Sequence, residues 1–194
     1  PVANAAGWHN TPVTLDLTAT DDLVGVKEIH VQTTVRSGAT VDGAVIAPGA
    51  SLTIALPDEG VYDLDYFAVD LLGNREPARQ LRVRIDRTAP TVAGLPQQPC
   101  LIWPPDKRMV RVADVVSDDS LSGIADVHVT AVADEPSDDD IVVDGGTVSV
   151  RAIRDGRGDG RTYVITAVAE DLAGIQTATH GTCTVPHDRS APKQ

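Results

Sequence analysis

The chain has 194 residues, of which 42% are hydrophobic but only 3% aromatic, so its core must be built from Val, Ile, Leu and Ala. Its formal net charge is −12, which disfavours binding to nucleic acid or to an anionic membrane surface and leaves cations as natural partners. No apolar run is long enough to predict membrane insertion, and the first residues, PVANAAGWHN, do not have the pattern of a secretion signal.

Alternating apolar and polar residues, bounded by Gly, Pro, Asp or Asn, predict β-strands throughout the chain. In PVTLDLTAT, residues 12–20, the side chains of Val13, Leu15 and Leu17 would share one face of a strand. No stretch of comparable length places apolar residues at helical spacing, so we expect an all-β protein. Further strands in the first half are predicted at residues 26–35, 39–46, 51–56, 62–70 and 78–86.

The second half of the chain repeats the first. GVKEIHV, which begins at Gly25, aligns with GIADVHV, which begins at Gly123, and the pentapeptide DRTAP at residues 86–90 returns as DRSAP at residues 188–192. The offset between the two copies drifts by only a few residues, as expected for two copies of one fold with small loop insertions. We therefore expect one domain at residues 1–90 and a second at residues 91–194.

Each copy has about 100 residues and six or seven short strands, which is typical of an immunoglobulin-like β-sandwich. The Pro-rich segment TAPTVAGLPQQP would supply the first, edge-type strand of the second domain. The corresponding segment of the first domain, PVANAAGWHN, is short, so its first strand is expected to be incomplete.

These residues also resemble a known family. GWHNTPVTLDLTATDDLVGVKEIHV, followed by EGVYDLDYFAVDLLGNRE and IDRTAP, is similar to the bacterial Ig-like repeats found in tandem in large secreted and cell-surface proteins, over residues 7–90. The second half resembles a sister module, with LIWPPDKRMV in place of its usual LWPPNHKM, so that Asp106 and Lys107 replace Asn-His. The resemblance implies spacer, adhesive or accessory modules and no catalytic residues.

The two cysteines, Cys100 and Cys183, lie near the two ends of the second half. A disulfide between them would close a long loop and fits the Pro-rich and Thr-rich β composition of secreted domains, whereas a reduced buried pair is the alternative. The disulfide would place the protein outside the cytoplasm, as secreted or cell-surface material.

Aspartates recur in the predicted loops and suggest a calcium site. In the usual strand order of a sandwich, the loop with Asp118 and Asp119 and the loop with Asp171 lie at one end, near the linker that contains Asp86. The A-x-D-x-x-G phrase is similar to that of cadherin-type repeats, which gather carboxylates for calcium, and calcium takes about six to eight oxygen ligands. The equivalent site of the first domain would use Asp21, Asp22 and Asp70 with a linker further upstream.

The same aspartates are also expected as turn formers, because an Asp side chain accepts hydrogen bonds from nearby backbone amides and a following glycine supplies a positive φ. The spacing fits both readings, which stay open here. A second acidic cluster, DEPSDDD at residues 134–140, is predicted as a solvated loop, with a surface calcium site as the alternative.

No motif for a nucleophile, a catalytic metal or a phosphate-binding loop is present, so we do not expect an enzyme. The sequence predicts a structural or spacer module whose partners are neighbouring domains of the same polypeptide. The alternative is an accessory module that binds carbohydrate or adheres to a surface protein. Trp8 and Trp103 could then stack on sugars, although packing at the edge of the sandwich is the other reading.

Overall fold

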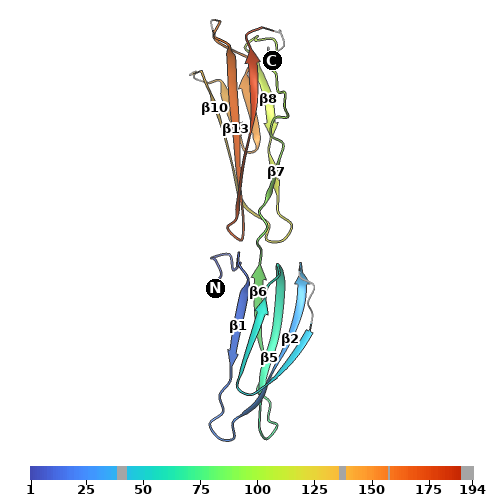
Figure 1. The fold of residues 1–194 in the computed structure, drawn as a ribbon. Helices are drawn as coiled ribbons and strands as arrows, with labels where there is room; N and C mark the ends of the chain where they lie inside the picture. Colours follow the sequence, from blue (N-terminus) through green and yellow to red (C-terminus); the bar gives the residue numbers. More distant parts are fainter. Residues whose placement is uncertain (39–42, 136–138, 157, 189–194) are drawn as a thin grey trace. The chain divides into compact units, whose positions relative to one another are not determined.

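The computed structural model describes residues 1–38, 43–135, 139–156 and 158–188, and the regular structure in these ranges is entirely β (Figure 1). They contain no helix that could span a bilayer. The chain divides into two compact units. The first comprises Pro1–Thr88 with Ser120–Ser122 and Leu172–Ile175, and the second Ala89–Asp119, Gly123–Asp171 and Gln176–Gln194.

The first unit is a β-sandwich of two antiparallel sheets, drawn in blue to green in Figure 1. Its smaller sheet pairs β1 (Val13–Thr18) with β4 (Ser51–Leu56) in full register. Its larger sheet has the strand order β3-β2-β5-β6, formed by β3 (Gly43–Pro48), β2 (Val26–Ser37), β5 (Gly60–Asp70) and β6 (Arg79–Ile85).

The core of the first unit lies between these sheets, because each strand turns alternate side chains inward. Val13 of β1 is buried as predicted, and Leu15 and Leu17 pack against the same core. Tyr62 on β5 is buried too, and its hydroxyl donates a hydrogen bond of 2.8 Å to the carbonyl oxygen of Asp58. The buried members of this core are Val13, Ile29, Val31, Leu56, Tyr62, Leu64, Val83 and Ile85.

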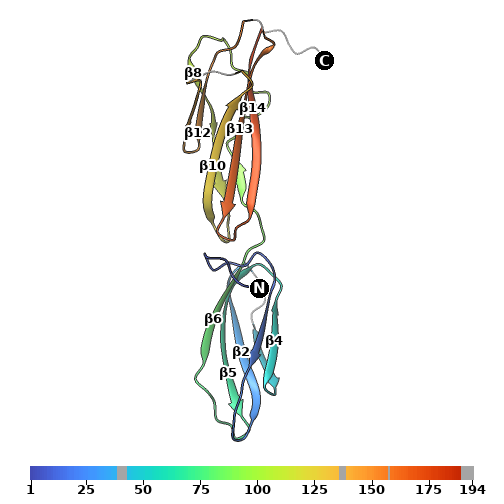
Figure 2. The same ribbon diagram turned by 90° about the vertical axis from the view of Figure 1, so that its left-hand side faces the viewer.

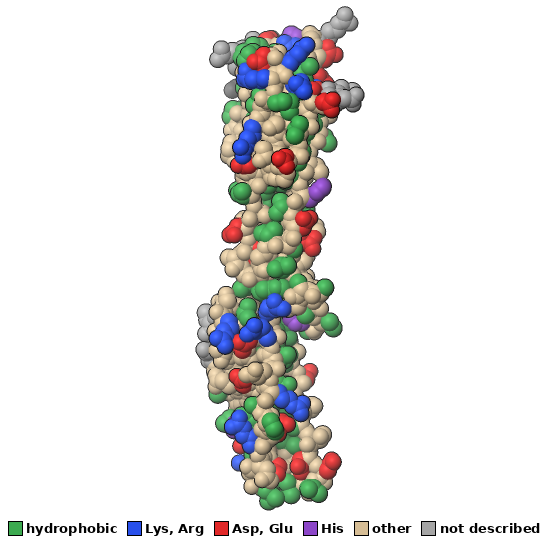
Figure 3. All heavy atoms as spheres, turned by 180° about the vertical axis from the view of Figure 1, so that it is seen from behind, with side chains coloured by type: hydrophobic (Ala, Val, Ile, Leu, Met, Phe, Trp, Pro, Cys, Tyr) green, Lys and Arg blue, Asp and Glu red, His purple; other side chains and the backbone are tan. Residues whose placement is uncertain are grey.

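Some large apolar side chains of the first unit lie outside its core. Leu23, in the β1–β2 loop, and Leu71 and Leu72, in the β5–β6 loop, are exposed. The space-filling view shows hydrophobic side chains beside acidic ones over these two loops (Figure 3).

The second unit is also a β-sandwich. In Figure 2 three of its strands lie side by side, in the order β10-β13-β14. The facing sheet has the order β11-β12-β8, and a short pair joins β7 to β9. The strands are β7 (Thr91–Ala93), β8 (Met109–Asp114), β9 (Val116–Asp118), β10 (Ile124–Ala133), β11 (Ile141–Asp144), β12 (Thr147–Arg151), β13 (Gly160–Asp171) and β14 (Gln176–Pro186).

Strand β13 shows why this sequence forms a sandwich, because every second residue from Arg161 to Asp171 is buried. Tyr163, Ile165 and Ala167 of this strand meet Val148 and Val150 of β12 in one cluster. The all-β prediction is confirmed, and each unit holds a hydrophobic core of its own.

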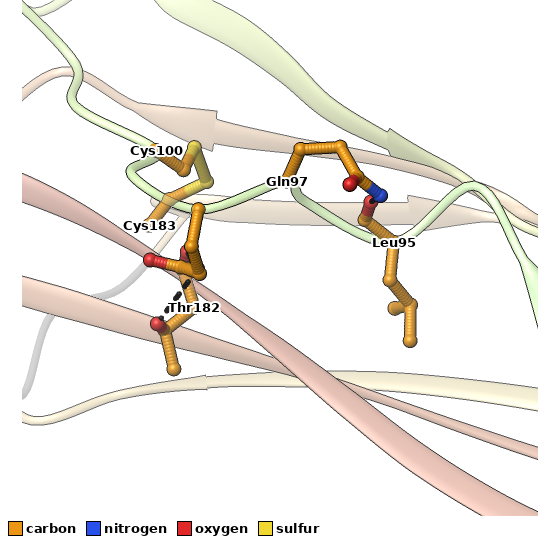
Figure 4. Close-up of a disulfide and its surroundings, with 6 residues drawn as sticks. Leu95, Gln97, Cys100, Thr182 and Cys183 are labelled. Atoms are coloured by element: carbon orange, nitrogen blue, oxygen red, sulfur yellow. Dashed lines mark hydrogen bonds between the residues drawn. A yellow bond between two sulfur atoms is a disulfide. The ribbon is translucent and has the colours of Figure 1, made fainter.

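Each unit also fixes the segment that leads into it against its last strand. In the first unit, His9 forms a parallel bridge with Ile85 of β6. In the second, Leu101 bridges Thr184 of β14, and the adjacent residues Cys100 and Cys183 form a disulfide (Figure 4). This leading segment lies so close to β14 that a Cβ on Gly181 would come within 2.7 Å of Cδ of Pro96, and only glycine fits there.

Candidate functional site: the acidic loops and the linker

Two aspartates converge at one end of the second unit. Asp119 directly follows β9, and Asp171 ends β13, where it pairs with Ile124 in the sheet register. Their carboxylate oxygens lie within 4.8 Å of each other, with Asp171 buried and Asp119 half-buried. Oδ1 of Asp119 accepts a 2.8 Å hydrogen bond from the amide of Gly123, whose φ of 82° is one that few other residues adopt.

Asp21 forms the equivalent turn in the first unit. Its Oδ1 accepts hydrogen bonds from the amides of Leu23 at 3.1 Å, Val24 at 2.7 Å and Gly25 at 2.8 Å. These bonds, above all those from Val24 and Gly25, hold the pKa of Asp21 below its usual value. Asp21 and Asp119 are therefore structural equivalents, since each binds the amide of the glycine four residues later.

Asp70 is the counterpart of Asp171, because it pairs with Val26 as Asp171 pairs with Ile124. The side-chain amide of Asn74 donates to its Oδ2 at 2.7 Å, and the backbone amides of Leu72 and Asn74 donate to its Oδ1 at 2.8 Å. The Asn74 bonds make the main contribution that lowers the pKa of Asp70, while the nearby charge of Asp21 acts in the opposite direction. The hydrogen bonds of Asp21 and Asp70 described above are those of turns.

Asp22 stands inside the Asp21–Gly25 turn, and Asp118 stands directly before Asp119. Both side chains are exposed. Asp118 ends β9, where it pairs with Thr91 and its backbone oxygen accepts a bond from the Thr91 hydroxyl at 3.1 Å. The sequence sets Asp21-Asp22 beside Asp118-Asp119, but the hydrogen bonds align Asp21 with Asp119, a shift of one residue.

Asp86 begins the DRTAP linker and is fully buried in the first unit. Its Oδ1 accepts from the amide of Thr88 at 3.1 Å, and its Oδ2 accepts from the amide of Ser122 at 3.0 Å. Within the described part of the chain, no Lys or Arg forms an ion pair with it. A buried carboxylate is costly unless hydrogen bonds or a cation compensate it, and the two backbone amides supply the hydrogen bonds described for Asp86.

Glu59 clamps the start of the same linker, which sequence reasoning did not anticipate. Its Oε1 accepts from the amide of Arg87 at 2.8 Å and from the hydroxyl of Thr88 at 3.0 Å, while its Oε2 lies 2.9 Å from that hydroxyl. Arg87 and Thr88 are thereby tied to the loop before β5. In the sequence, Glu59 is recognisable only as an acidic residue directly before Gly60, which starts β5. Its role as a hydrogen-bond acceptor for Arg87 and Thr88 becomes visible only in the folded structure.

The second acidic cluster differs from its prediction where it is described; residues 136–138 lie outside the described ranges. Asp140 is only 4% exposed, and it pairs with Nη1 of Arg161 at 2.6 Å and with Nε of Arg151 at 2.8 Å. The solvated-loop prediction is therefore wrong for Asp140. Its burial is compensated by ion pairs with two arginines on different strands, Arg151 on β12 and Arg161 on β13.

The aromatic residues provide few free ring faces. Trp8 is buried, with the guanidinium of Arg84 5.4 Å from its ring. Phe67, on the outer face of β5, is covered by His30 at 4.6 Å between ring centroids and by Arg75, whose guanidinium carbon is 3.6 Å from the Phe67 centroid. Trp103, at 37% exposure, is the most exposed aromatic side chain in the described ranges.

No protein family and no curated protein matches this sequence. Three solved structures show a distant likeness to it. Fibronectin(III)-like modules of Clostridium thermocellum CbhA are 14% identical, with a TM-score of 0.34 over 100% of this chain and 96% of theirs. Drosophila N-cadherin EC1-4 is 17% identical, with a TM-score of 0.45 over 82% of this chain and 41% of its own.

The third is the sialic acid binding region of a Streptococcus sanguinis SK1 adhesin, bound to 3'sLn, which is 10% identical with a TM-score of 0.32. That match covers 92% of this chain and 74% of the adhesin chain. At such identities and scores, none of the three assigns a function to the chain.

Proposed function

We propose that this chain is a non-catalytic structural module of a secreted or cell-surface protein, which spaces or presents neighbouring domains, and that calcium stiffens the linker after its first unit. The observation that carries the proposal is the burial of Asp86 at the start of the linker, without an ion pair among the described residues. A cation bound at that position would stabilise the buried carboxylate.

Calcium fits the available ligands. Asp119 and Asp171 already bring two carboxylate oxygens together in the second unit, and Asp86 would add a third. Calcium is a hard cation that prefers carboxylate, carbonyl and water oxygens, and it tolerates irregular geometry. Backbone carbonyls of the linker and water would complete its shell. Asp118, which the sequence also suggests, would stay outside because its side chain is exposed and its backbone belongs to β9.

The disulfide supports an extracellular setting. Cys100 and Cys183 account for both cysteines of the chain, and structural disulfides persist mainly in oxidising compartments. A module that is covalently closed and charged at −12 suits exposure outside the cell.

Thermal melting in EDTA and in millimolar calcium, with small-angle scattering on the same samples, tests this proposal. Calcium should raise the melting temperature and narrow the range of particle conformations, because a ligand bound only by the folded state stabilises it. Asp171→Asn should abolish both effects, whereas Asp16→Asn, which alters an exposed aspartate on β1 outside the acidic loops, should leave them unchanged. Equal melting in EDTA and calcium would mean that these loops are turns only.

A carbohydrate-binding accessory module remains the second candidate, and Trp103 is the residue that would carry it. Its ring is the most exposed aromatic among the described residues, since Trp8 is buried and Phe67 is in contact with His30 and Arg75. Retardation by immobilised polysaccharide that Trp103→Ala abolishes would favour this candidate. If the unaltered chain and Trp103→Ala migrated equally through the polysaccharide, the carbohydrate-binding candidate would be rejected in favour of the spacer function.

A further inference from the structure

The larger sheet of the first unit has one joined edge and one open edge. At β6 the sheet continues into the leading segment, through the parallel bridge between Ile85 and His9. At the other edge, β3 pairs with β2 on one side, and among the described residues no strand pairs with its other side (Figure 1). An open edge presents unpaired backbone groups, so a further strand can bind there.

The hydrogen-bond pattern shows which backbone groups of β3 face outward. The amide of Gly49, directly after the strand, donates to the carbonyl of Lys27 on β2 at 2.7 Å. Along an antiparallel strand, the backbone groups of successive residues point to opposite sides, so every second residue before Gly49 also faces β2. The residues between them, whose groups point outward, are Ala44, Ile46 and Pro48. Pro48 fits an outward position, because it has no amide hydrogen to donate.

The side chains of β3 are apolar and exposed on both faces of the sheet. Ile46 is 59% exposed and Val45 46%. On the outer face Ile46 lies opposite His30 of β2, and His30 lies opposite Phe67 of β5, with their ring centroids 4.6 Å apart. Edge strands are usually protected by lysines, bulges or prolines, and of these β3 has only Pro48 at its end. This strand is therefore suited to pair with another.

We propose that β3 is the docking site for β3 of a second copy of this chain, which pairs with it in antiparallel orientation about a two-fold axis. Identical strands paired in this way are self-complementary, since each offers the same groups to the other. With the axis at Ile46, the amide and carbonyl of Ile46 would bond to those of Ile46 in the second copy. The outer row of Phe67, His30 and Ile46 would then continue across the axis.

The distribution of charge favours a second copy at this strand. Each copy has a net charge of −12, so two copies repel each other over much of their surface. Residues 43–57, which include β3 and β4, contain no charged side chain, whereas β6 at the joined edge carries Arg79, Arg82 and Arg84. The copies therefore meet at β3 with the least electrostatic cost. This lateral pairing goes beyond the spacer function proposed above and does not depend on calcium.

Sedimentation equilibrium of the full chain in EDTA tests the proposal. The range should run from about 10 µM to about 1 mM, because one short strand from each copy makes a smaller and weaker interface than the standard one. The average mass should rise from that of one chain toward that of two. Ile46→Lys should keep the mass of one chain throughout, because two lysines would face each other across the axis. Val142→Lys is the matched control, since Val142 is 51% exposed on β11 in the second unit, and this change should leave the dimer intact.

A mixture of two variants tests the register. Ile46→Glu alone should also keep the mass of one chain, but a mixture of Ile46→Lys with Ile46→Glu should restore the dimer, because opposite charges then face each other. The unfolding transition of Trp8 shows whether each variant folds. A single-chain mass of the unaltered protein at every concentration, a dimer that persists in Ile46→Lys, or a mixture that does not pair would overturn the proposal. Since EDTA is present throughout, a failure of the calcium proposal would leave these results unchanged.

Discussion

Each unit contains one aspartate that is held by two arginines, and the two sets differ in their exposure. In the first unit Asp63 pairs with Arg36 at 2.8 Å and Arg82 at 2.6 Å, and the two arginine side chains are 63% and 60% exposed. In the second unit the side chains of Asp140 and Arg161 are only 5% and 3% exposed. The two arginines of the first set are thus largely exposed around a partly buried Asp63, whereas Asp140 and Arg161 of the second set are buried and only Arg151, at 33%, reaches the solvent.

The difference shows that the units share a fold but not the interactions that hold it. Hydrogen bonds from Arg82 and Arg36 lower the pKa of Asp63 well below its usual range, yet exposed ion pairs add little stability because water and salt screen them. A buried set is different, because removing one member leaves a charge without solvent or partner. The segments that lead into the two units are also held by different interactions. In the first unit Trp8 packs against Arg84, and in the second a disulfide joins Cys100 to Cys183.

The largest effect is expected from Asp140→Asn. It should reduce the free energy of unfolding of the second unit by about 3 to 5 kcal/mol, because Arg161 would stay buried without its carboxylate. Urea unfolding followed by tryptophan fluorescence measures this, since Trp103 reports on the second unit and Trp8 on the first.

The matched control is Asp63→Asn in the first unit. It should leave the Trp8 transition close to that of the unaltered chain, because both arginine partners are largely exposed and water and salt screen the two ion pairs. If Asp63→Asn destabilised its unit as strongly as Asp140→Asn does, the distinction between the two sets would fail.

Removal of the disulfide comes next. Cys183→Ser should lower the stability of the second unit by about 2 to 4 kcal/mol, because the bond closes a loop with a sequence separation of 83 residues and so restricts the unfolded chain. Cys100→Ser should give the same value. Differential scanning calorimetry would show one transition shifting; a shift of both would mean that the two units melt as one body.

A smaller effect is expected from Glu59→Gln, which weakens the clamp on the linker. The first unit should lose about 1 kcal/mol, because hydrogen bonds to a charged acceptor become bonds to a neutral one in a half-buried site. Amide hydrogen exchange at Arg87 and Thr88 should accelerate. Unchanged exchange at both amides would show that the clamp does not hold the linker.

The smallest expected effect concerns pH. Burial, and to a lesser degree the charge of the chain's amino terminus, lowers the pKa of His9 from 6.5. The folded state therefore binds a proton less readily than the unfolded state, so the first unit should lose stability as the pH falls below about 6.5. Unfolding between pH 8 and pH 5 should show this slope in the Trp8 transition, and His9→Gln should remove it. A slope that persists in the variant would point to another group.

The strands were predictable because their signal is local. The predicted strands at 26–35, 51–56 and 62–70 correspond to β2, β4 and β5, since alternation along a strand depends only on which neighbours face the core. The prediction at 39–46 falls partly outside the described residues, and β3 begins at Gly43.

The interactions of the acidic residues were less predictable. Asp140 lies in a sequence that looks solvated, and its burial depends on Arg151 and Arg161, which only the fold brings to it. Likewise, two acidic pairs at a similar offset conceal a shift of one residue, and only the bonds to Gly25 and Gly123 show which aspartates correspond. Contacts between residues on different strands cannot be predicted from the spacing of residues along the sequence.

The disulfide next to the linker has a mechanical consequence. If the chain is pulled from its two ends, tension that reaches Cys100 passes directly to Cys183 through the sulfur bridge. The residues between them carry no load, and their extended length, roughly 280 Å at about 3.4 Å per residue, cannot be released. Under force the first unit would act as the extensible element and the second as a short, nearly inextensible link.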